Sequence, residues 1–112
     1  MSNTISQQGI ARSLMINKKT NFEIPLNEIL LLQGDANYTN FVFLGRNKYM
    51  IAHSLKHFEA ELLTKGFVRL HRSYLVNKLH ILQTNSQDST IVLTDGRELQ
   101  VARRRIKELK NL

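Results

Sequence analysis

Turn signals recur at short intervals along this chain and limit it to short elements of secondary structure. Glycine, asparagine and aspartate close most apolar segments after about four to eight residues, which suits a strand and is short for a helix. Asp-Gly at residues 95–96 predicts a tight two-residue hairpin turn after a strand at residues 89–94. Gly-Arg-Asn at residues 45–47 predicts a hairpin between strands at residues 38–44 and 48–53.

The other segments extend this prediction. A loop is expected at residues 34–37, where Gly, Asp, Ala and Asn follow one another. Further strands are expected at residues 10–16, 21–25, 29–32, 67–70, 74–76, 79–84 and 97–101. Together with only two short helices, these segments predict a mostly β fold.

One helix is marked clearly by its apolar spacing. Leu55, Phe58 and Leu62 recur at i, i+3 and i+7, as on the buried face of an amphipathic helix. Ser54 stands where a residue can cap the first turn, and Gly66 follows the expected end. A second, basic helix is expected to close the chain.

Length and composition favour one folded unit. With 112 residues, of which 42% are hydrophobic, the chain suffices for one core. Residues 1–9 are polar and are expected to form a disordered tail, and residues 10–112 the folded domain. No cysteine is present, which excludes disulfides and thiolate metal sites and fits a reducing compartment. Neither a membrane span nor a signal peptide is recognisable, so we expect a cytoplasmic protein without a membrane partner.

Positive charge is concentrated in two clusters. The net charge is +7, yet residues 62–87 contain no acidic residue at all. The basic residues of that stretch are Lys65, Arg69, Arg72 and Lys78. A second cluster begins the expected C-terminal helix at residues 103–105. Charge of this kind attracts polyanions, but it does not distinguish DNA from RNA, acidic lipid or an acidic protein.

Arg72 is the strongest candidate for reading a base. An arginine can donate two parallel hydrogen bonds to guanine O6 and N7, a contact worth about 1–3 kcal/mol of discrimination. Strict strand alternation would place Arg72 on the side opposite to His71 and Ser73, whereas a sharp turn between residues 70 and 74 would present all three. The alternative is an arginine in a surface ion pair, although no acidic residue is near it in the sequence.

Two more segments carry groups that bind nucleic acids. Asn37, Thr39 and Asn40 offer amides and a hydroxyl to phosphate oxygens or an adenine edge, although such residues also fill ordinary turns. The three arginines at 103–105 begin a helix, where the helix dipole disfavours cations. A bound phosphate would offset that unfavourable placement.

Enzymatic and metal-binding chemistry find little support. A hydrolase would have to use His71 and Ser73, but no carboxylate lies near them in the sequence, and glycine-rich phosphate loops are missing. His53 and His57 have the i, i+4 spacing of helical metal ligands without a matching third ligand. We therefore expect no catalytic residue, no metal and no cofactor.

The segment at residues 67–81, FVRLHRSYLVNKLHI, closely resembles the central signature of the LytTR DNA-binding domain. This domain is the output domain of LytR/AlgR-type response regulators. Residues 29–43, ILLLQGDANYTNFVF, resemble the family's strand and a loop that ends in a variant of Asn-Tyr-Thr. Arg103 and Arg104 resemble the basic pair before its last helix. The resemblance covers about residues 10–112.

The resemblance implies an elongated LytTR-type multi-stranded β fold whose loops enter successive major grooves of double-stranded DNA. It further implies sequence-specific binding in bacterial transcription regulation. The base-reading positions implied by the resemblance are Thr39, Asn40, Arg72 and Arg104. The implied DNA backbone or supporting positions are Asn37, His71, Ser73, Lys78, Arg103 and Arg105.

The resemblance also implies partners. Two copies are expected on repeated half-sites, and a receiver domain or a histidine-kinase pathway of a two-component system is expected outside this chain. The alternative is a regulatory interaction module that kept the fold but binds an acidic protein partner. Enrichment of a motif from random duplex DNA distinguishes the two.

Overall fold

The computed structural model describes residues 12–45 and 47–111, so the tail expected at residues 1–9 and the domain start at residue 10 lie outside the described residues. The described strands are β1 (Ser13–Asn17), β2 (Phe22–Pro25), β3 (Ile29–Asp35), β4 (Tyr38–Phe43), β5 (Lys48–Ile51), β6 (Phe67–His71), β7 (Tyr74–Asn77), β8 (Ile81–Asn85), β9 (Thr90–Leu93) and β10 (Glu98–Gln100). The described helices are α2 (Leu55–Leu63) and the 3-10 helices η1 (Leu26–Glu28), η2 (Lys78–His80) and η3 (Arg103–Asn111). None of these helices is long and apolar enough to cross a membrane. The predicted mostly β fold is confirmed, and the two short helices expected are α2 and η3, each of nine residues.

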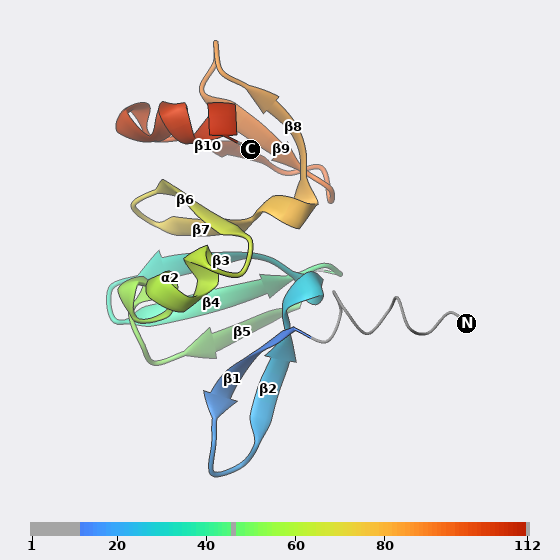
Figure 1. The fold of residues 1–112 in the computed structure, drawn as a ribbon, viewed down its shortest axis with the longest axis vertical. Helices are drawn as coiled ribbons and strands as arrows, with labels where there is room; N and C mark the ends of the chain where they lie inside the picture. The colour runs from blue at the N-terminus through green and yellow to red at the C-terminus, as the bar shows by residue number, and fades with distance from the viewer. Residues whose placement is uncertain (1–11, 46, 112) are drawn as a thin grey trace, which may run out of the picture.

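The strands form three antiparallel sheets that follow one another along the longest axis (Figure 1). A hairpin of β1 and β2 lies at one end, and a three-stranded sheet in the order β10-β9-β8 lies at the other. Between them is a five-stranded sheet in the order β5-β4-β3-β7-β6. The domain measures 42 × 39 × 24 Å, so it is extended in two directions and thin in the third.

Strand β3 is the centre of the molecule and is buried on both faces. Ile29, Leu30, Leu31 and Leu32 are all exposed by 1% or less, as a continuous apolar run predicts for a fully buried strand. The pairing with β4 shifts register between Ile29 and Leu31, which marks a bulge. Because of this bulge, Leu30 and Leu31 face one core, while Ile29 and Leu32 face the other.

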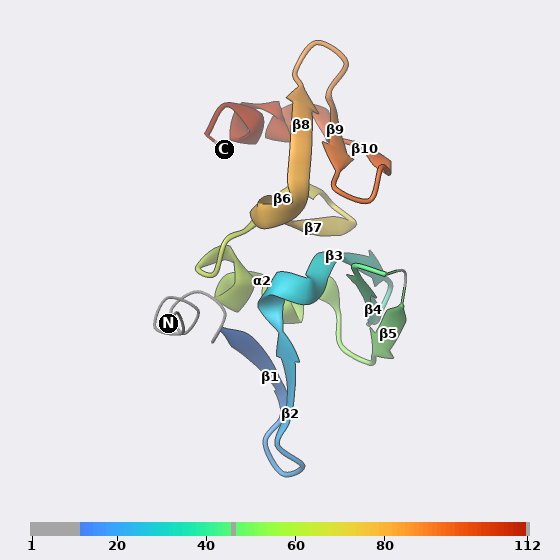
Figure 2. The same ribbon diagram turned by 90° about the vertical axis from the view of Figure 1, so that its right-hand side faces the viewer.

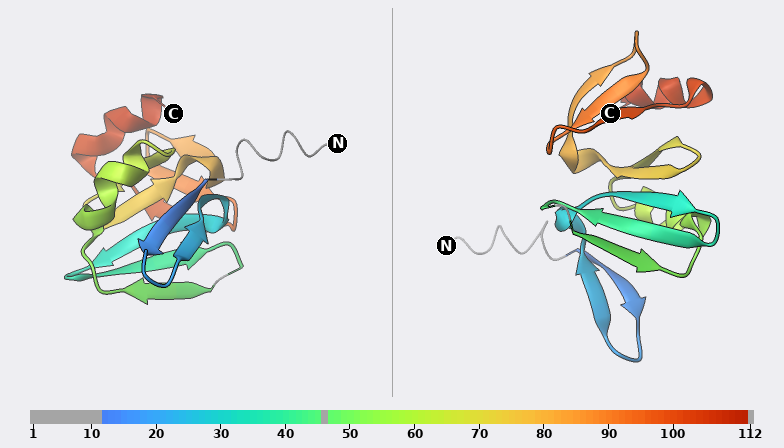
Figure 3. Two further views of the ribbon diagram at one scale, coloured as in Figure 1. Left: turned by 60° about the horizontal axis from the view of Figure 1, so that its bottom comes forward. Right: turned by 180° about the vertical axis from the view of Figure 1, so that it is seen from behind.

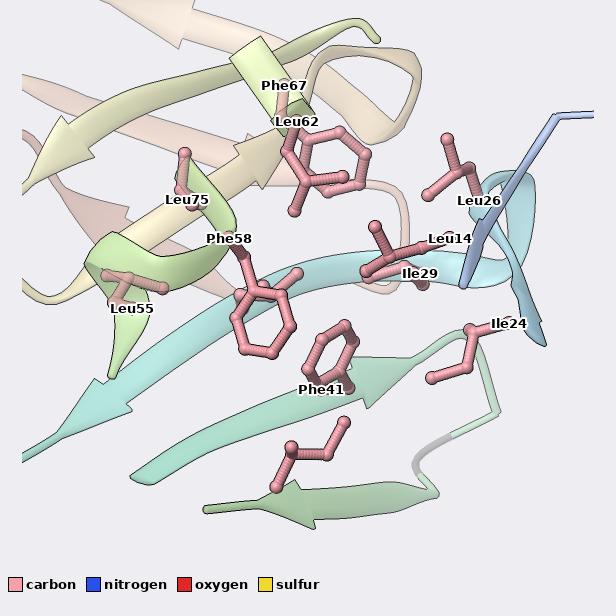
Figure 4. Close-up of a cluster of buried hydrophobic side chains, with 12 residues drawn as sticks. Leu14, Ile24, Leu26, Ile29, Phe41, Leu55, Phe58, Leu62, Phe67 and Leu75 are labelled. Carbon is pink, nitrogen blue, oxygen red and sulfur yellow. The ribbon is translucent and has the colours of Figure 1, made fainter. Parts of the chain in front are cut away.

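Helix α2 covers one face of the five-stranded sheet. Leu55, Phe58 and Leu62 are its buried residues, as the spacing predicts. The rings of Phe58 and Phe41 meet edge to face with centroids 5.1 Å apart. Figure 4 shows these side chains pointing toward one another from the helix and the sheet. A β-carbon at Gly34 would lie 3.0 Å from the Leu55 β-carbon, so glycine permits the close approach of α2 to β3.

The opposite face of the sheet packs against the C-terminal part of the chain. Ile91 and Leu93 of β9, with Val101, join Leu30 and Leu31 in a second core. Helix η3 adds Ile106 and Leu109 to this core. These residues are three positions apart, so they lie on the same side of a 3-10 helix. Figure 2 shows η3 and the three-stranded sheet together on this side.

Several local predictions differ from the structure. The loop expected at residues 34–37 shrinks to a two-residue turn, because Gly34 and Asp35 still pair with β4. The turn after β9 has three residues rather than two. Leu93 N donates to Arg97 O at 2.9 Å, and Gly96 adopts a φ of 94° that glycine tolerates. Ser54 occupies the N-cap position of α2, as expected, but its side chain makes no capping hydrogen bond.

Candidate nucleic-acid interface

Three segments that are distant in sequence meet at one edge of the molecule. Because β3 and β7 are antiparallel neighbours, the β3–β4 turn and the β6–β7 turn lie at the same edge of the sheet. Gly34 N donates to Ser73 O at 2.9 Å, and Ala102 N donates to Leu70 O at 2.8 Å. The second bond brings the start of η3 to the same place. This edge, called the turn edge below, is on the left of Figure 1 and on the right of the rear view in Figure 3.

The β6–β7 turn places Arg72 at its tip. His71 pairs with Tyr74, which leaves Arg72 and Ser73 as a two-residue turn. Arg72 is exposed, while His71 and Ser73 are half-buried. The Ser73 amide donates to His71 Nδ1 at 3.1 Å, so His71 supports the turn from within. The sharp turn therefore replaces the strict alternation that would have separated these three residues.

Arg69 holds this turn from behind, a role that sequence reasoning missed. Its Nε donates to His71 O at 2.8 Å, and its second guanidinium nitrogen donates to Arg72 O. Its remaining nitrogen pairs with Glu59 of α2 at 2.5 Å. The Arg69 side chain is only 14% exposed. Its position two residues before His71 was visible in the sequence, but its direction toward the turn backbone was not.

The β3–β4 turn offers amides rather than charge. Asn37 is exposed at the turn, and Asn40 is half-buried on β4. Ala36 has a φ of 56°, which helps to close the tight turn. The nearby Asp35 is also exposed, so this turn by itself is no basic element. Its contribution to a nucleic-acid site would be hydrogen bonding.

Thr39 lies in the interior, which corrects the expectation that it reads a base. It is 0% exposed, and its hydroxyl donates to His53 O at 2.7 Å. A side chain without exposed surface touches no ligand in this conformation. Thr39 instead ties β4 to the segment that leads into α2.

Replacing Thr39 by valine is expected to lower the free energy of unfolding by about 1 kcal/mol, since the hydrogen bond from the buried Thr39 hydroxyl to His53 O is lost. Chemical denaturation followed by circular dichroism measures the change. Base preference in DNA binding should stay as it was. A base preference that changes with unaltered stability would return Thr39 to the reading positions.

The start of η3 supplies the densest positive charge of the turn edge. Arg103 and Arg104 are exposed, and Arg105 is half-buried. Arg105 N donates to Ala102 O at 2.8 Å, which closes the first turn of the helix. The helix expected to begin near Arg103 is thus confirmed, although it is a 3-10 helix.

Ion pairs inside the molecule use part of the charge that the sequence clusters contain. Lys65 pairs with Glu61 at 2.6 Å, and Arg69 pairs with Glu59. Within residues 12–45 and 47–111, no ion pair involves Arg72, Arg103 or Arg104. The arginines of the turn edge are therefore available to an external anion.

Lys78 is separated from the other candidate residues. It follows the C-terminal end of β7, whereas the turn edge lies before its start. Its amide donates to Gly66 O at 3.0 Å, beyond the other end of the sheet. Four strand residues span about 13 Å, so Lys78 lies at the end of β7 opposite to Arg72.

Other polar residues near the sheet have structural contacts. Asn77 is 5% exposed and its amide donates to two backbone carbonyls, and Phe67 and Val76 lie in the cores. His71 Nδ1 accepts a backbone amide rather than the Ser73 hydroxyl, which is not the arrangement of a histidine that activates a nucleophile. The rings of His53 and His57 stack 4.0 Å apart and nearly parallel.

The groups at the turn edge are those of a nucleic-acid-binding protein. Turns on a β scaffold present exposed arginines and amides, which suits the backbone and base edges of a nucleic acid. Residues 11–112 match the family described as the LytTr DNA-binding domain, and the chain belongs to this family. The family is one of DNA-binding domains and not of enzymes.

Individual relatives agree with this assignment. The transcriptional regulatory protein LytR of Staphylococcus aureus is 30% identical over 69% of this chain and 32% of its own length. The heme-containing CO-sensing transcriptional regulator RcoM 2 of Paraburkholderia xenovorans is 31% identical over 80% of this chain and 34% of its own length. The chain thus spans about a third of these curated relatives.

A solved structure shares the fold. It is the LytTr DNA-binding domain of a putative methyl-accepting/DNA response regulator from Bacillus cereus. The match has a TM-score of 0.67 and 23% identity, and it covers 89% of this chain and 93% of the other.

Proposed function

We propose that this domain binds double-stranded DNA in a sequence-specific manner in bacterial transcription regulation, with the turn edge inserted into successive major grooves. The proposal rests on the position of Arg72 at the tip of the β6–β7 turn. Its side chain is exposed, the turn backbone behind it is held by Arg69, and no internal ion pair in the described residues uses its charge. An arginine presented in this way suits a guanine edge.

The dimensions of the domain support contacts to more than one groove. Its longest axis measures 42 Å, and successive major grooves on one side of B-DNA are about 34 Å apart. The turn edge runs along that axis, from the β3–β4 turn past Arg72 to the start of η3 (Figure 1). A domain of this length can lie along the DNA from one major groove to the next, with its turn edge facing the duplex.

Roles can be divided among the residues of the turn edge. Arg72, Asn40 and Arg104 are proposed to contact bases. Asn37, Arg103 and Arg105 are proposed to contact phosphates, because exposed amides and guanidinium groups bind phosphate oxygens. His71 and Ser73 are proposed to shape the turn, and Thr39 to support β4.

The regulatory setting is proposed from the relatives. LytR and RcoM 2 are named as transcriptional regulators, and the matched part is about a third of each. We propose that this domain likewise acts as the DNA-binding part of a regulator, with two copies on repeated half-sites. A receiver domain or a histidine-kinase pathway would lie outside this chain.

Selection from random duplex DNA tests the proposed function directly. We expect a short repeated motif to be enriched at moderate salt. Each neutralised phosphate contributes about −0.9 to the slope of log K against log salt, so contacts from Arg103 and Arg105 alone predict a slope near −2 or steeper. Fluorescence anisotropy across a salt series measures it. No enriched motif together with a flat salt dependence would contradict the proposal.

Replacing Arg72 by alanine should relax base preference at one position of the selected motif. The expected loss is about 1–3 kcal/mol on the selected duplex, with a much smaller change on a random duplex. Anisotropy on both duplexes measures the difference. Equal losses on the two would remove Arg72 from the base-reading residues.

Two lysine variants are measured together with Arg72→Ala. Lys18→Ala removes one charge from the exposed β1–β2 turn, at the bottom of Figure 1, and controls for net charge alone. Lys78→Ala tests the one candidate that lies away from the turn edge. Uniform weakening of both duplexes would show that DNA reaches Lys78 as a phosphate contact. No change would remove Lys78 from the interface.

A further inference from the structure

An open apolar groove lies at the end of the sheet opposite to the turn edge. It has a volume of about 600 Å³, and its apolar lining includes Leu26, Phe67 and Leu79. A second hollow of about 310 Å³ shares Lys78 with the groove and is lined in part by Leu82 and Leu109. The two hollows together form a surface that DNA binding at the turn edge leaves uncovered.

Two leucines of this surface project into solvent. Leu79 and Leu82 are both 66% exposed, the largest exposed fractions among the large hydrophobic residues of the described chain. They flank the short segment that leads from η2 into β8. Exposed apolar side chains beside a groove mark a surface that binds a partner.

The charge around this surface has one sign. Arg12, Lys65 and Lys78 line the larger groove, and neither hollow has an acidic residue in its lining. Lys65 already pairs with Glu61. Among the described residues, Arg12 and Lys78 take part in no ion pair. An occupant that carries carboxylates beside apolar side chains would match both features.

Other occupants fit less well. A second copy of this chain would bring the same cations together if it bound with its own groove, because the lining contains no acidic residue. Residues 1–11 of this chain contain no aspartate or glutamate, so they offer no complementary charge. A DNA backbone would satisfy the cations but would leave the apolar floor and the exposed leucines without a partner.

We propose that this groove and the adjoining hollow, called the rear groove, dock an acidic segment of a partner protein that also carries leucine-like side chains. The apolar side chains of the segment cover Leu79 and the floor at Phe67. Its carboxylates meet Arg12 and Lys78. Since the rear groove and the turn edge lie at opposite ends of the sheet, partner and DNA can be bound together.

A peptide of alternating glutamate and leucine blocks is the probe. It is titrated into the full chain labelled with 15N, and amide chemical shifts are followed by NMR. We expect saturable shifts at Gly66, Leu79 and Leu82, with Asn37, Ser73 and Ala102 unmoved. Polyglutamate of equal charge should bind at least about tenfold more weakly, because it lacks the apolar part.

Variants make the test specific. Arg12→Ala and Leu79→Asp should each weaken peptide binding, by about threefold and tenfold respectively. Their matched controls are Lys18→Ala on the β1–β2 turn and Met50→Asp on β5, where Met50 is 60% exposed. Both controls should bind the peptide as the parent does. Thermal unfolding of every variant verifies that it is folded.

The outcomes separate this proposal from the proposed function. The docking proposal would be overturned by amide shifts confined to the turn edge, or by binding of polyglutamate as tight as that of the leucine-containing peptide. Binding of the chain to vesicles of anionic lipid but not to the peptide would also overturn it. The absence of any saturable shift would do the same. DNA affinity is measured on the same samples. A parent chain that binds DNA but not the peptide overturns the rear-groove proposal alone and leaves the proposed function standing.

Discussion

Replacing Asn77 by alanine is expected to lower the free energy of unfolding by about 3 kcal/mol. The Asn77 amide donates to Leu26 O at 3.1 Å and to Ile29 O at 2.8 Å, and its oxygen accepts from Leu79 N at 3.1 Å. The residue is only 5% exposed. Alanine leaves these backbone groups without their partner, and each unsatisfied buried group is unfavourable by about 1–3 kcal/mol. Urea unfolding followed by circular dichroism measures the loss.

Asn17→Ala is the matched control for that measurement. The Asn17 side chain also accepts backbone amides, from Lys19 at 2.9 Å and Thr20 at 3.3 Å, but at an exposed turn. Water can replace it there, so a loss below about 1 kcal/mol is expected. Equal losses for the two variants would show that Asn77 does no more than order a local turn.

Replacing Arg69 by alanine is expected to abolish the base preference that Arg72 provides, although Arg69 lies behind the turn. Without its guanidinium, His71 O and Arg72 O lose their donor, and Glu59 is left without its ion-pair partner. The turn then samples other conformations, and Arg72 no longer meets the base in a fixed geometry. The affinity for the selected duplex should fall by about 1–3 kcal/mol, as for Arg72→Ala.

A double-mutant cycle distinguishes this positioning role from a general loss of stability. If Arg69 acts through Arg72, the double variant should bind no more weakly than either single variant. Arg69→Lys keeps the charge beside Glu59 but lacks the planar fork, so it should restore stability more fully than base preference. Additive losses in the cycle would contradict the positioning role. Binding is measured well below the unfolding transition of each variant.

Local patterns predicted most of the elements. The apolar spacing of Leu55, Phe58 and Leu62 located α2, and the continuous apolar run at residues 29–32 predicted a strand. Both signals are local, because they depend on residues close together in the chain, so a single sequence carries them. The segment at residues 67–81 also indicated the family through its resemblance to the LytTR signature.

Which residues form the candidate interface depends on tertiary contacts that no local sequence pattern shows. Thr39 and Asn40 are neighbours in sequence, yet the pairing of β4 puts Thr39 inside. Arg69 and Arg72 belong to the same basic stretch, but Glu59 and the turn backbone use the first, and only the second stays exposed.

Residue types and their periods were sufficient for the β-rich class, the helix α2 and the basic character of the chain. Strand order and register decided the interface, because they join residues far apart in the chain. The bonds from Gly34 to Ser73 and from Ala102 to Leu70 bring three segments to one edge. The same strand directions send Lys78 to the other end of β7. Antiparallel pairing and the bond that joins the start of η3 to β6 are non-local interactions, and for that reason the tertiary structure determined which basic residues share a surface.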